Sequence, residues 1–76
     1  MPTLDQLRPG QRGRVLSLQG DPPLVQRLMD LGVLEGEEVE VVGFAPLGDP
    51  MELRLGNSRL SLRRRDAAGI EVHEIE

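Results

Sequence analysis

The sequence has no cysteine, tryptophan, tyrosine or lysine, and its 76 residues include one phenylalanine and one histidine. The lack of cysteine excludes disulfides, thiolate metal sites and a cysteine nucleophile, and it fits a reducing compartment. The near-absence of aromatic residues removes the stacking platforms on which single-stranded nucleic acids bind. It also excludes an aromatic-lined groove for proline-rich peptides.

Long apolar runs and an excess of positive charge are missing as well. Nine arginines stand against thirteen acidic residues, for a formal net charge of -4. Because most affinity for nucleic acid comes from neutralised phosphates, we expect no nucleic-acid partner. No apolar stretch approaches the roughly 20 residues of a membrane span, and the N-terminus lacks the features of a signal peptide. We therefore expect one cytoplasmic domain over residues 1–76, with no direct membrane insertion.

The middle of the chain predicts a short helix that ends at a glycine. Leu24, Leu28 and Leu31 recur at helical spacing, so we expect them to form the buried stripe of a helix over residues 23–31. Gly32 follows directly and can adopt the left-handed backbone that ends a helix. A helix this short depends on packing against the rest of the domain.

Short strands are predicted on both sides of that helix, because apolar and polar residues alternate there between turn residues. The predicted strands are residues 11–18, 38–44, 51–55, 59–63 and 70–75. Gly56 and Asn57 predict a hairpin, and a helical turn is expected over residues 64–69. Closure of the sheet would remove its exposed edges. The residues thus predict a mainly β fold, a small barrel of about five strands with an inserted short α-helix.

His73 and Glu71 are weak candidates for a metal site. They share one face of the last predicted strand, where the carboxylate of Glu52 or Glu76 could join them. A stable site needs three or four convergent ligands with supporting contacts, so we favour a solvated histidine near the chain end. No resident cofactor is predicted, and weak binding of a divalent metal is left open.

A catalytic set is not visible in the sequence. The hydroxyl residues lie outside any nucleophile elbow, one histidine is available as a base, and no Walker-type phosphate loop is present. A domain of this size also has little room for a buried pocket. We predict that the chain is not an enzyme.

The one basic cluster is Arg63, Arg64 and Arg65. Such a cluster could bind phosphate or an acidic partner. A run of three is short for a nucleic-acid patch, so we favour a structural role. In that interpretation Arg63 pairs with a loop carboxylate such as Asp49, while Arg64 and Arg65 are solvated.

Two turns carry more apolar side chains than a core of this size can hold. The first spans residues 31–34 and the second residues 45–51. Their side chains either form an exposed patch that marks a protein contact or seal the ends of the barrel. The candidate partner-binding residues are Leu31, Gly32, Val33, Leu34, Ala45, Pro46, Leu47, Gly48, Asp49, Pro50 and Met51.

Four blocks of residues follow one another along the chain in a distinctive order. They are Leu4-x-x-Leu7-x-Pro9-Gly10, then Leu28-x-x-Leu31-Gly32-Val33-x-x-Gly36, then Ala45-Pro46-Leu47-Gly48-Asp49-Pro50, then Leu60-x-Leu62-Arg63 with Ala67 and Ile70. In order and spacing, the chain resembles the FeoA family over essentially its whole length. The second and third blocks are the most specific part. The resemblance implies an SH3-like barrel.

The resemblance also implies a partner. Members of that family are small cytosolic proteins that accompany FeoB, a membrane ferrous-iron transporter with a cytosolic GTPase domain. A non-catalytic accessory role in ferrous iron uptake would follow, exerted by contact with FeoB at the inner face of the membrane. A similar barrel forms the C-terminal domain of some metal-dependent repressors, so the alternative is a metal-responsive module of that kind. The expected links to iron and to GTP rest on the family resemblance alone, and no residue pattern in the sequence indicates them independently.

Overall fold

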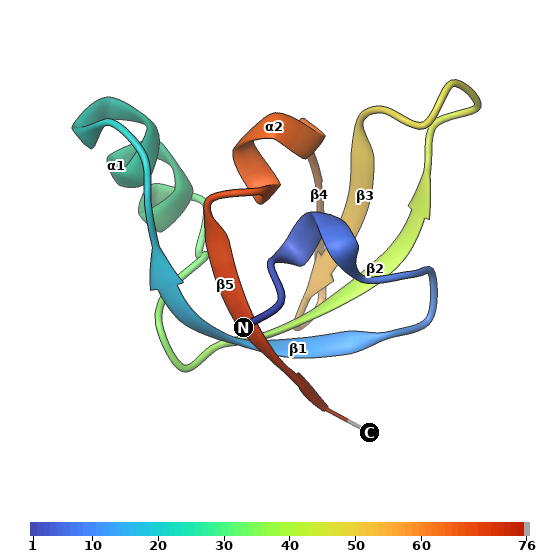
Figure 1. The fold of residues 1–76 in the computed structure, drawn as a ribbon, viewed down its shortest axis with the longest axis horizontal. Helices are drawn as coiled ribbons and strands as arrows, with labels where there is room; N and C mark the ends of the chain where they lie inside the picture. The colour runs from blue at the N-terminus through green and yellow to red at the C-terminus, as the bar shows by residue number, and fades with distance from the viewer. Residues whose placement is uncertain (76) are drawn as a thin grey trace.

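A computed structural model describes residues 1–75, and in it five short strands curl around one core (Figure 1). The elements are the 3-10 helix η1 (Leu4–Gln6), the helices α1 (Pro22–Asp30) and α2 (Arg64–Ala67), and the strands β1 (Arg12–Leu18), β2 (Glu38–Phe44), β3 (Met51–Leu55), β4 (Ser58–Leu62) and β5 (Ile70–Ile75). No helix over residues 1–75 combines the length and the apolar character that crossing a membrane requires.

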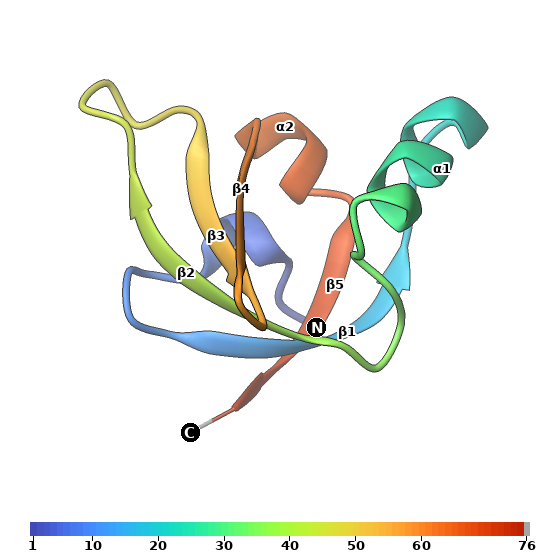
Figure 2. The same ribbon diagram turned by 180° about the vertical axis from the view of Figure 1, so that it is seen from behind.

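All five strands belong to one antiparallel sheet with the order β4-β3-β2-β1-β5. A register shift between Val15 and Ser17 bends β1, which pairs with both β2 and β5. Over residues 1–75 no ladder joins β4 to β5, so the expected closure of the sheet is wrong. The short helix α2 connects these two edge strands instead (Figure 2). The fold is therefore a curled five-stranded sheet that hydrogen bonds do not close.

The core lies inside the curl. Along β2, Val39 and Val41 are buried while Glu38 is exposed, as strand alternation predicts. The 3-10 helix η1 contributes Leu4, which is fully buried. The buried apolar residues are Leu4, Leu7, Val15, Leu28, Val33, Val39, Val41, Met51, Leu53, Leu62, Ala67, Ile70 and Val72.

Helix α1 ends at Asp30, and the predicted glycine, Gly32, follows its C-cap residue Leu31. Gly32 has a φ of +97°, and its N–H donates to the carbonyl of Met29 at 3.0 Å. The N–H of Val33 donates to the carbonyl of Leu28 at 2.9 Å. This pair of bonds is a Schellman motif, in which the apolar residue after the glycine packs on the last turn of the helix. The helix stop is thereby confirmed, and the motif directs Val33 into the core.

The turn after α2 depends on a second glycine for a different reason. Gly69 has an ordinary φ, but a Cβ built on it would lie 2.3 Å from the carbonyl oxygen of Gln19. The N–H of Gln19 donates to the carbonyl of Gly69 at 2.7 Å. The end of β1 and the start of β5 approach so closely that no side chain fits between them.

Candidate docking surface

The first predicted turn, residues 31–34, presents two leucines to solvent. Leu31 and Leu34 are 50% and 39% exposed, whereas Val33 between them is fully buried. The prediction that Leu31 completes the buried stripe of the helix is wrong, because α1 ends at Asp30 and the backbone turns there. Val33 in turn cannot touch a partner, because the glycine stop directs it inward.

An open depression adjoins these two leucines. It is lined by Leu31, Gly32, Leu34, Glu37, Leu55, Gly56 and Ser58. The last three belong to the hairpin between β3 and β4, and they are not among the partner-binding residues predicted from the sequence. The sheet order brings this hairpin beside the end of α1, and local sequence does not contain that order. The one local indication of a contact surface was an apolar residue, Leu55, next to the hairpin turn.

The second predicted turn joins β2 to β3 and is held by its own hydrogen bonds. The N–H of Ala45 donates to the carbonyl of Pro50 at 3.0 Å, and the N–H of Gly48 donates to the carbonyl of Ala45 at 2.7 Å. Leu47 is 98% exposed near the tip of this loop. Met51, at the start of β3, is fully buried and belongs to the core instead of to a contact surface.

Asp49 ties this loop to α2. Its Oδ1 accepts the backbone N–H of Arg64 at 2.9 Å, and its Oδ2 lies 4.0 Å from a guanidinium nitrogen of Arg63. The predicted pair with Arg63 is confirmed. Arg64 is not simply solvated, because its guanidinium lies 4.9 Å from the centre of the Phe44 ring and donates to the carbonyl of Gly48 at 3.4 Å.

The structure does not bring the two predicted turns together. In both ribbon views the loop between β2 and β3 and the turn after α1 lie on opposite sides of the molecule, with α2 between them (Figures 1 and 2). The predicted partner-binding residues therefore form two surfaces. One consists of Leu31 and Leu34 beside the β3–β4 hairpin, and the other is the tip of the loop at Leu47.

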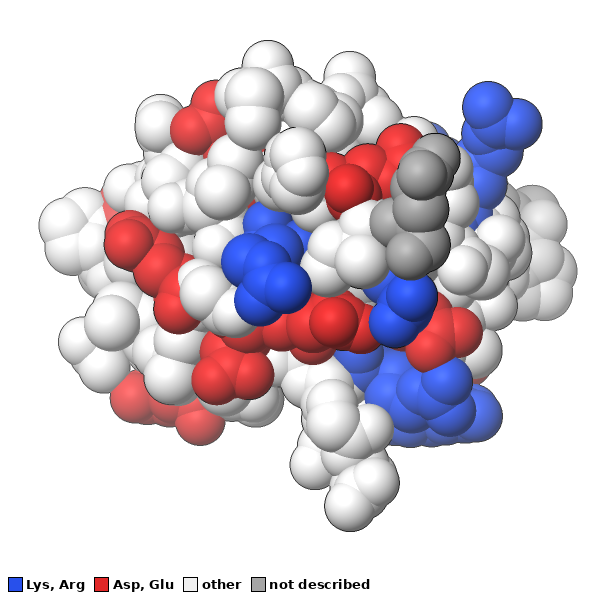
Figure 3. Space-filling model, turned by 90° about the horizontal axis from the view of Figure 1, so that it is seen from below, with Lys and Arg blue, Asp and Glu red and all other residues white. Residues whose placement is uncertain are grey.

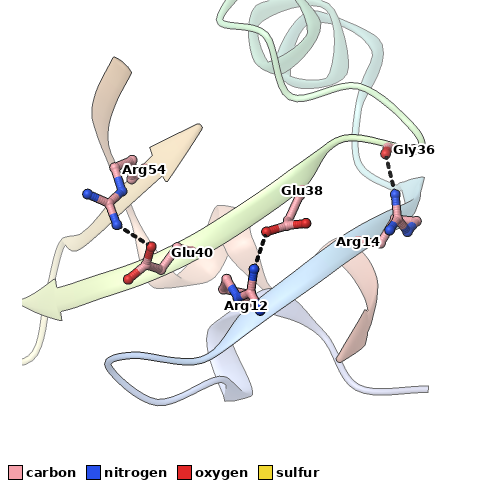
Figure 4. A network of polar contacts seen from close by, with 6 residues as sticks. All are labelled: Arg12, Arg14, Gly36, Glu38, Glu40 and Arg54. Atoms are coloured by element: carbon pink, nitrogen blue, oxygen red, sulfur yellow. Dashed lines mark hydrogen bonds and ion pairs between the residues drawn. The ribbon is translucent and has the colours of Figure 1, made fainter. Parts of the chain in front are cut away.

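The outer face of the sheet carries charges that alternate from strand to strand. Arg12 on β1 pairs with Glu38 on β2 at 2.8 Å, and Glu40 on β2 pairs with Arg54 on β3 (Figure 4). Figure 3 shows arginine and acidic side chains interleaved on the face seen from below. Solvent reaches all of these side chains, so each pair contributes little to stability. The pattern instead defines which charges a partner meets.

The metal candidates His73 and Glu71 do not converge on a common point. His73 is exposed and lies opposite Arg14 of β1, whose positive charge opposes a bound cation. The carboxylate of Glu71 accepts a hydrogen bond from Ser17 at 2.7 Å. Glu52 lies on β3, which β2 and β1 separate from β5, and Glu76 lies outside the described residues. Within residues 1–75 no group of three or more His, Cys, Asp or Glu side chains is placed to hold a metal ion.

Comparison with known proteins identifies relatives over almost the whole chain. The FeoA domain family model matches residues 3–74. Over 72 residues the chain is 36% identical to the Fe(2+) transport protein A/Fe(2+) transporter FeoB fusion protein of Porphyromonas gingivalis. That match covers 95% of this chain and 8% of the fusion protein. The chain thus corresponds to one small part of that relative.

Solved structures show the same fold. The FeoA protein of Chlorobium tepidum superimposes with a TM-score of 0.93 at 41% identity, covering 99% of this chain and 71% of that one. The zinc-complexed FeoA of Stenotrophomonas maltophilia, a prokaryotic SH3-domain protein, gives 0.84 at 31% identity, covering 96% and 91%. A manganese-dependent transcriptional repressor gives 0.88 at 18% identity, covering 96% of this chain and 40% of that one, which shows a shared fold alone.

Proposed function

Because the chain belongs to the FeoA domain family, we propose that it is an accessory protein of ferrous iron uptake that acts by contact with the transporter FeoB. The observation that carries this proposal is the relative in which a domain like this one is fused to FeoB. A covalent link between two domains raises the effective concentration of each at the other, which favours a direct contact between them. The proposed role is non-catalytic and places the chain at the cytoplasmic face of the membrane.

The exposed leucines beside the hairpin are the proposed contact with FeoB. Leu31 and Leu34 are half-exposed at the rim of a depression to which Leu55 adds a third apolar wall. Removing such side chains from water is favourable by about 25 cal/mol for each Å² of apolar surface, and the complex keeps the part of this free energy that exceeds the cost of association. Leu47 lies on the other surface, so we propose it as a separate contact.

The test is a titration of the purified chain against full-length FeoB from the same organism in nanodiscs, with and without GTP. We expect saturable binding, and we expect Leu34→Glu to weaken it by about ten-fold or more, because a carboxylate would have to lose its water in the complex. Leu16→Glu is the matched control, since Leu16 on β1 is 38% exposed and lies outside both surfaces.

Two outcomes of this titration would count against the proposal. Absence of binding to folded FeoB in either nucleotide state would refute the accessory role. If Leu34→Glu and Leu47→Glu both fold normally and bind like the parent chain, the role stands but both proposed surfaces are wrong. Circular dichroism of each variant establishes that it is folded before it is scored.

The alternative role is a metal-responsive module, in view of the zinc-complexed relative and the fold shared with the repressor. Calorimetry with Zn²⁺ and Mn²⁺ tests it. Because the described residues offer no three-ligand group, we expect no heat of binding at millimolar metal. A saturable heat that His73→Ala abolishes would establish the alternative.

A further inference from the structure

The strand β4 forms an open edge of the sheet. Its register places Leu55 opposite Ser58 across a two-residue turn, so these two residues exchange the ladder hydrogen bonds. The backbone N–H and C=O groups of the alternate residues Arg59 and Ser61 therefore point away from β3. Both residues are exposed, and no described residue forms a hydrogen bond with these backbone groups.

The opposite edge of the sheet is covered in part by the chain itself. The carbonyl of Pro2 accepts the N–H of Val72 at 3.0 Å, and Thr3 forms a β-bridge with Glu71. Through these contacts the N-terminal segment covers the edge of the first half of β5. The long stretch of unpaired backbone that another strand could join is therefore on β4.

The charge of the β4 edge is unlike that of the chain as a whole. Residues 53–65 contain five of the nine arginines and no acidic residue, although the chain has a net charge of -4. Arg59 lies directly opposite Arg54, so two like charges face each other across the strands. Arg54 is neutralised by Glu40, whereas no carboxylate of residues 1–75 lies within 4.0 Å of a nitrogen of Arg59.

This arrangement interrupts the alternation of charge on the outer face of the sheet. The face carries arginine on β1, glutamate on β2 and arginine on β3, and then arginine again on β4. A further strand beside β4 would restore the alternation if it presented carboxylates on this face. Opposite charges on neighbouring strands attract each other, and a carboxylate there would also relieve the repulsion between Arg54 and Arg59.

The other face of such a strand would meet an apolar environment. The depression formed by Leu31, Leu34 and Leu55 reaches Ser58, the first residue of β4. Side chains of a strand alternate between its two faces, so residues between the acidic ones would point toward these leucines and Leu60. The chemistry of the two faces thus favours a strand in which acidic and apolar residues alternate.

We propose that the β4 edge binds an extended segment of a partner protein, added to the sheet as a sixth strand, in which acidic side chains alternate with apolar ones. Strand addition of this kind takes affinity from backbone hydrogen bonds and specificity from alternate side chains. The inference rests on the proposed function in taking the partner to be a protein, and it deepens that function by defining the form and charge of the docking segment.

Charge argues for a partner protein and against a second copy of this chain. Two copies joined edge to edge through β4 would bring their arginines together, which is unfavourable. The acidic strand β5 of a second copy carries Glu71 and Glu74, but the N-terminal segment covers the first half of its edge.

The test uses a defined probe, the fluorescein-labelled peptide Thr-Glu-Ile-Glu-Val-Glu-Thr, and the same peptide with lysine in place of each glutamate. Fluorescence anisotropy measures binding to the full chain. Both the chain and the acidic peptide are negatively charged, so long-range attraction between net charges cannot produce binding. We expect the acidic peptide to bind and the lysine peptide to show no saturable binding.

Two substitutions in β4 test the charge and the backbone separately. Arg59→Glu should weaken binding by about ten-fold or more, because it removes the cation that faces the added strand. Arg8→Glu is its control with the same change in net charge, since Arg8 is exposed and precedes β1. Ser61→Pro removes a backbone N–H that points away from β3 and forms no hydrogen bond in the ladder. Edge strands tolerate proline at such a position, and Ser61→Ala is the control because it changes the side chain and keeps this N–H.

The outcomes separate this inference from the proposed function. The β4 inference is overturned if Arg59→Glu and Arg8→Glu weaken peptide binding equally, or if the chain binds both peptides or neither. It is also overturned if light scattering shows that the free chain is a dimer and that Arg59→Glu dissociates this dimer. If Ser61→Pro does not fold, the protection of the Arg59 and Ser61 amides from hydrogen exchange on peptide binding replaces it. Binding of FeoB that is unaffected by Arg59→Glu would leave the accessory role intact and refute the β4 site.

Discussion

At the scale of single residues, Gly32 and Gly69 are required for two different reasons. Gly32 adopts a φ of +97° in open space, so its requirement lies in the backbone alone. Gly69 has an ordinary φ but no room, because the carbonyl of Gln19 fills the position of a Cβ. The sequence predicts that Gly32 ends a helix, because it follows an apolar helical stripe. It places Gly69 at the end of the helical turn expected over residues 64–69, but it does not show that the carbonyl of Gln19 leaves no room for a side chain there.

Replacing Gly32 tests the backbone reason. Gly32→Val should lower the free energy of unfolding by about 1–2 kcal/mol, because a β-branched residue is strained at positive φ. Urea denaturation followed by circular dichroism measures the change. Gly43→Ala is the control, since Gly43 lies in β2 without a positive φ and its Cβ would meet open space. Equal stability of Gly32→Val and the parent chain would show that the helix stop does not need a left-handed residue.

At the scale of elements, the loop between β2 and β3 caps α2, a helix that it does not adjoin in the sequence. Arg63, at the N-cap position of α2, makes no capping bond with its side chain. Asp49 supplies that bond to the first N–H of the helix from 15 residues earlier in the chain. The loop and α2 are therefore one structural unit, which explains a helix of only four residues.

Removing the distant cap should loosen this unit. Asp49→Ala is expected to lower the free energy of unfolding by about 1 kcal/mol, as the loss of a capping side chain does elsewhere. Hydrogen exchange of the Arg64 backbone amide should be faster in Asp49→Ala than in the parent chain. Asp21→Ala is the contrast, because Asp21 occupies the N-cap position of α1 without forming a side-chain hydrogen bond. Similar effects of the two substitutions would mean that the bond from Asp49 does not stabilise α2.

The strands were the most predictable elements. The bounds of β2 and β3 agree with the predicted residues 38–44 and 51–55, because each alternates cleanly and ends at turn residues. β1 begins one residue later than predicted, and β4 begins and ends one residue earlier than the predicted residues 59–63, because adjacent polar residues leave these boundaries undefined. Closure of the sheet was predicted wrongly, since pattern alone does not show that α2 connects the two edge strands.

The candidate surface was only partly predictable. Leu31, Leu34 and Leu47 are exposed as a contact requires, while Val33 and Met51 are buried in the core. Whether the two turns meet depends on the path of the sheet between them, which local sequence does not contain. The hairpin residues beside Leu31 and the unpaired edge at Arg59 likewise follow from the strand order.

At the scale of the whole molecule, the N-terminal segment completes the core. Leu4 and Leu7 come from outside the sheet and are 0% and 4% exposed, so the open curl depends on them for cover. Pro2 and Thr3 in turn contact β5. A domain of this size is marginally stable, and one buried leucine is a large fraction of its stability.

Two leucines of opposite exposure test this dependence. Leu4→Ala should lower the free energy of unfolding by about 2–5 kcal/mol, through lost burial and the cavity left behind. Leu47→Ala, at a site 98% exposed, should change it by less than about 0.5 kcal/mol. Thermal and urea unfolding measure both. A small effect at Leu4 would mean that the sheet holds its core without the N-terminal segment.

The stacking of Arg64 on Phe44 has a spectroscopic consequence. Phe44 is the only phenylalanine, tyrosine or tryptophan of the chain, and the one histidine, His73, lies on β5, so ring-current shifts at Arg64 come from Phe44. The Arg64 guanidinium lies over this ring, and its Hδ and Hε protons should resonate upfield of those of the other arginines. Their chemical shifts would report directly, in a natural-abundance NMR spectrum, whether the loop is docked on α2 in the free chain and when a partner is bound.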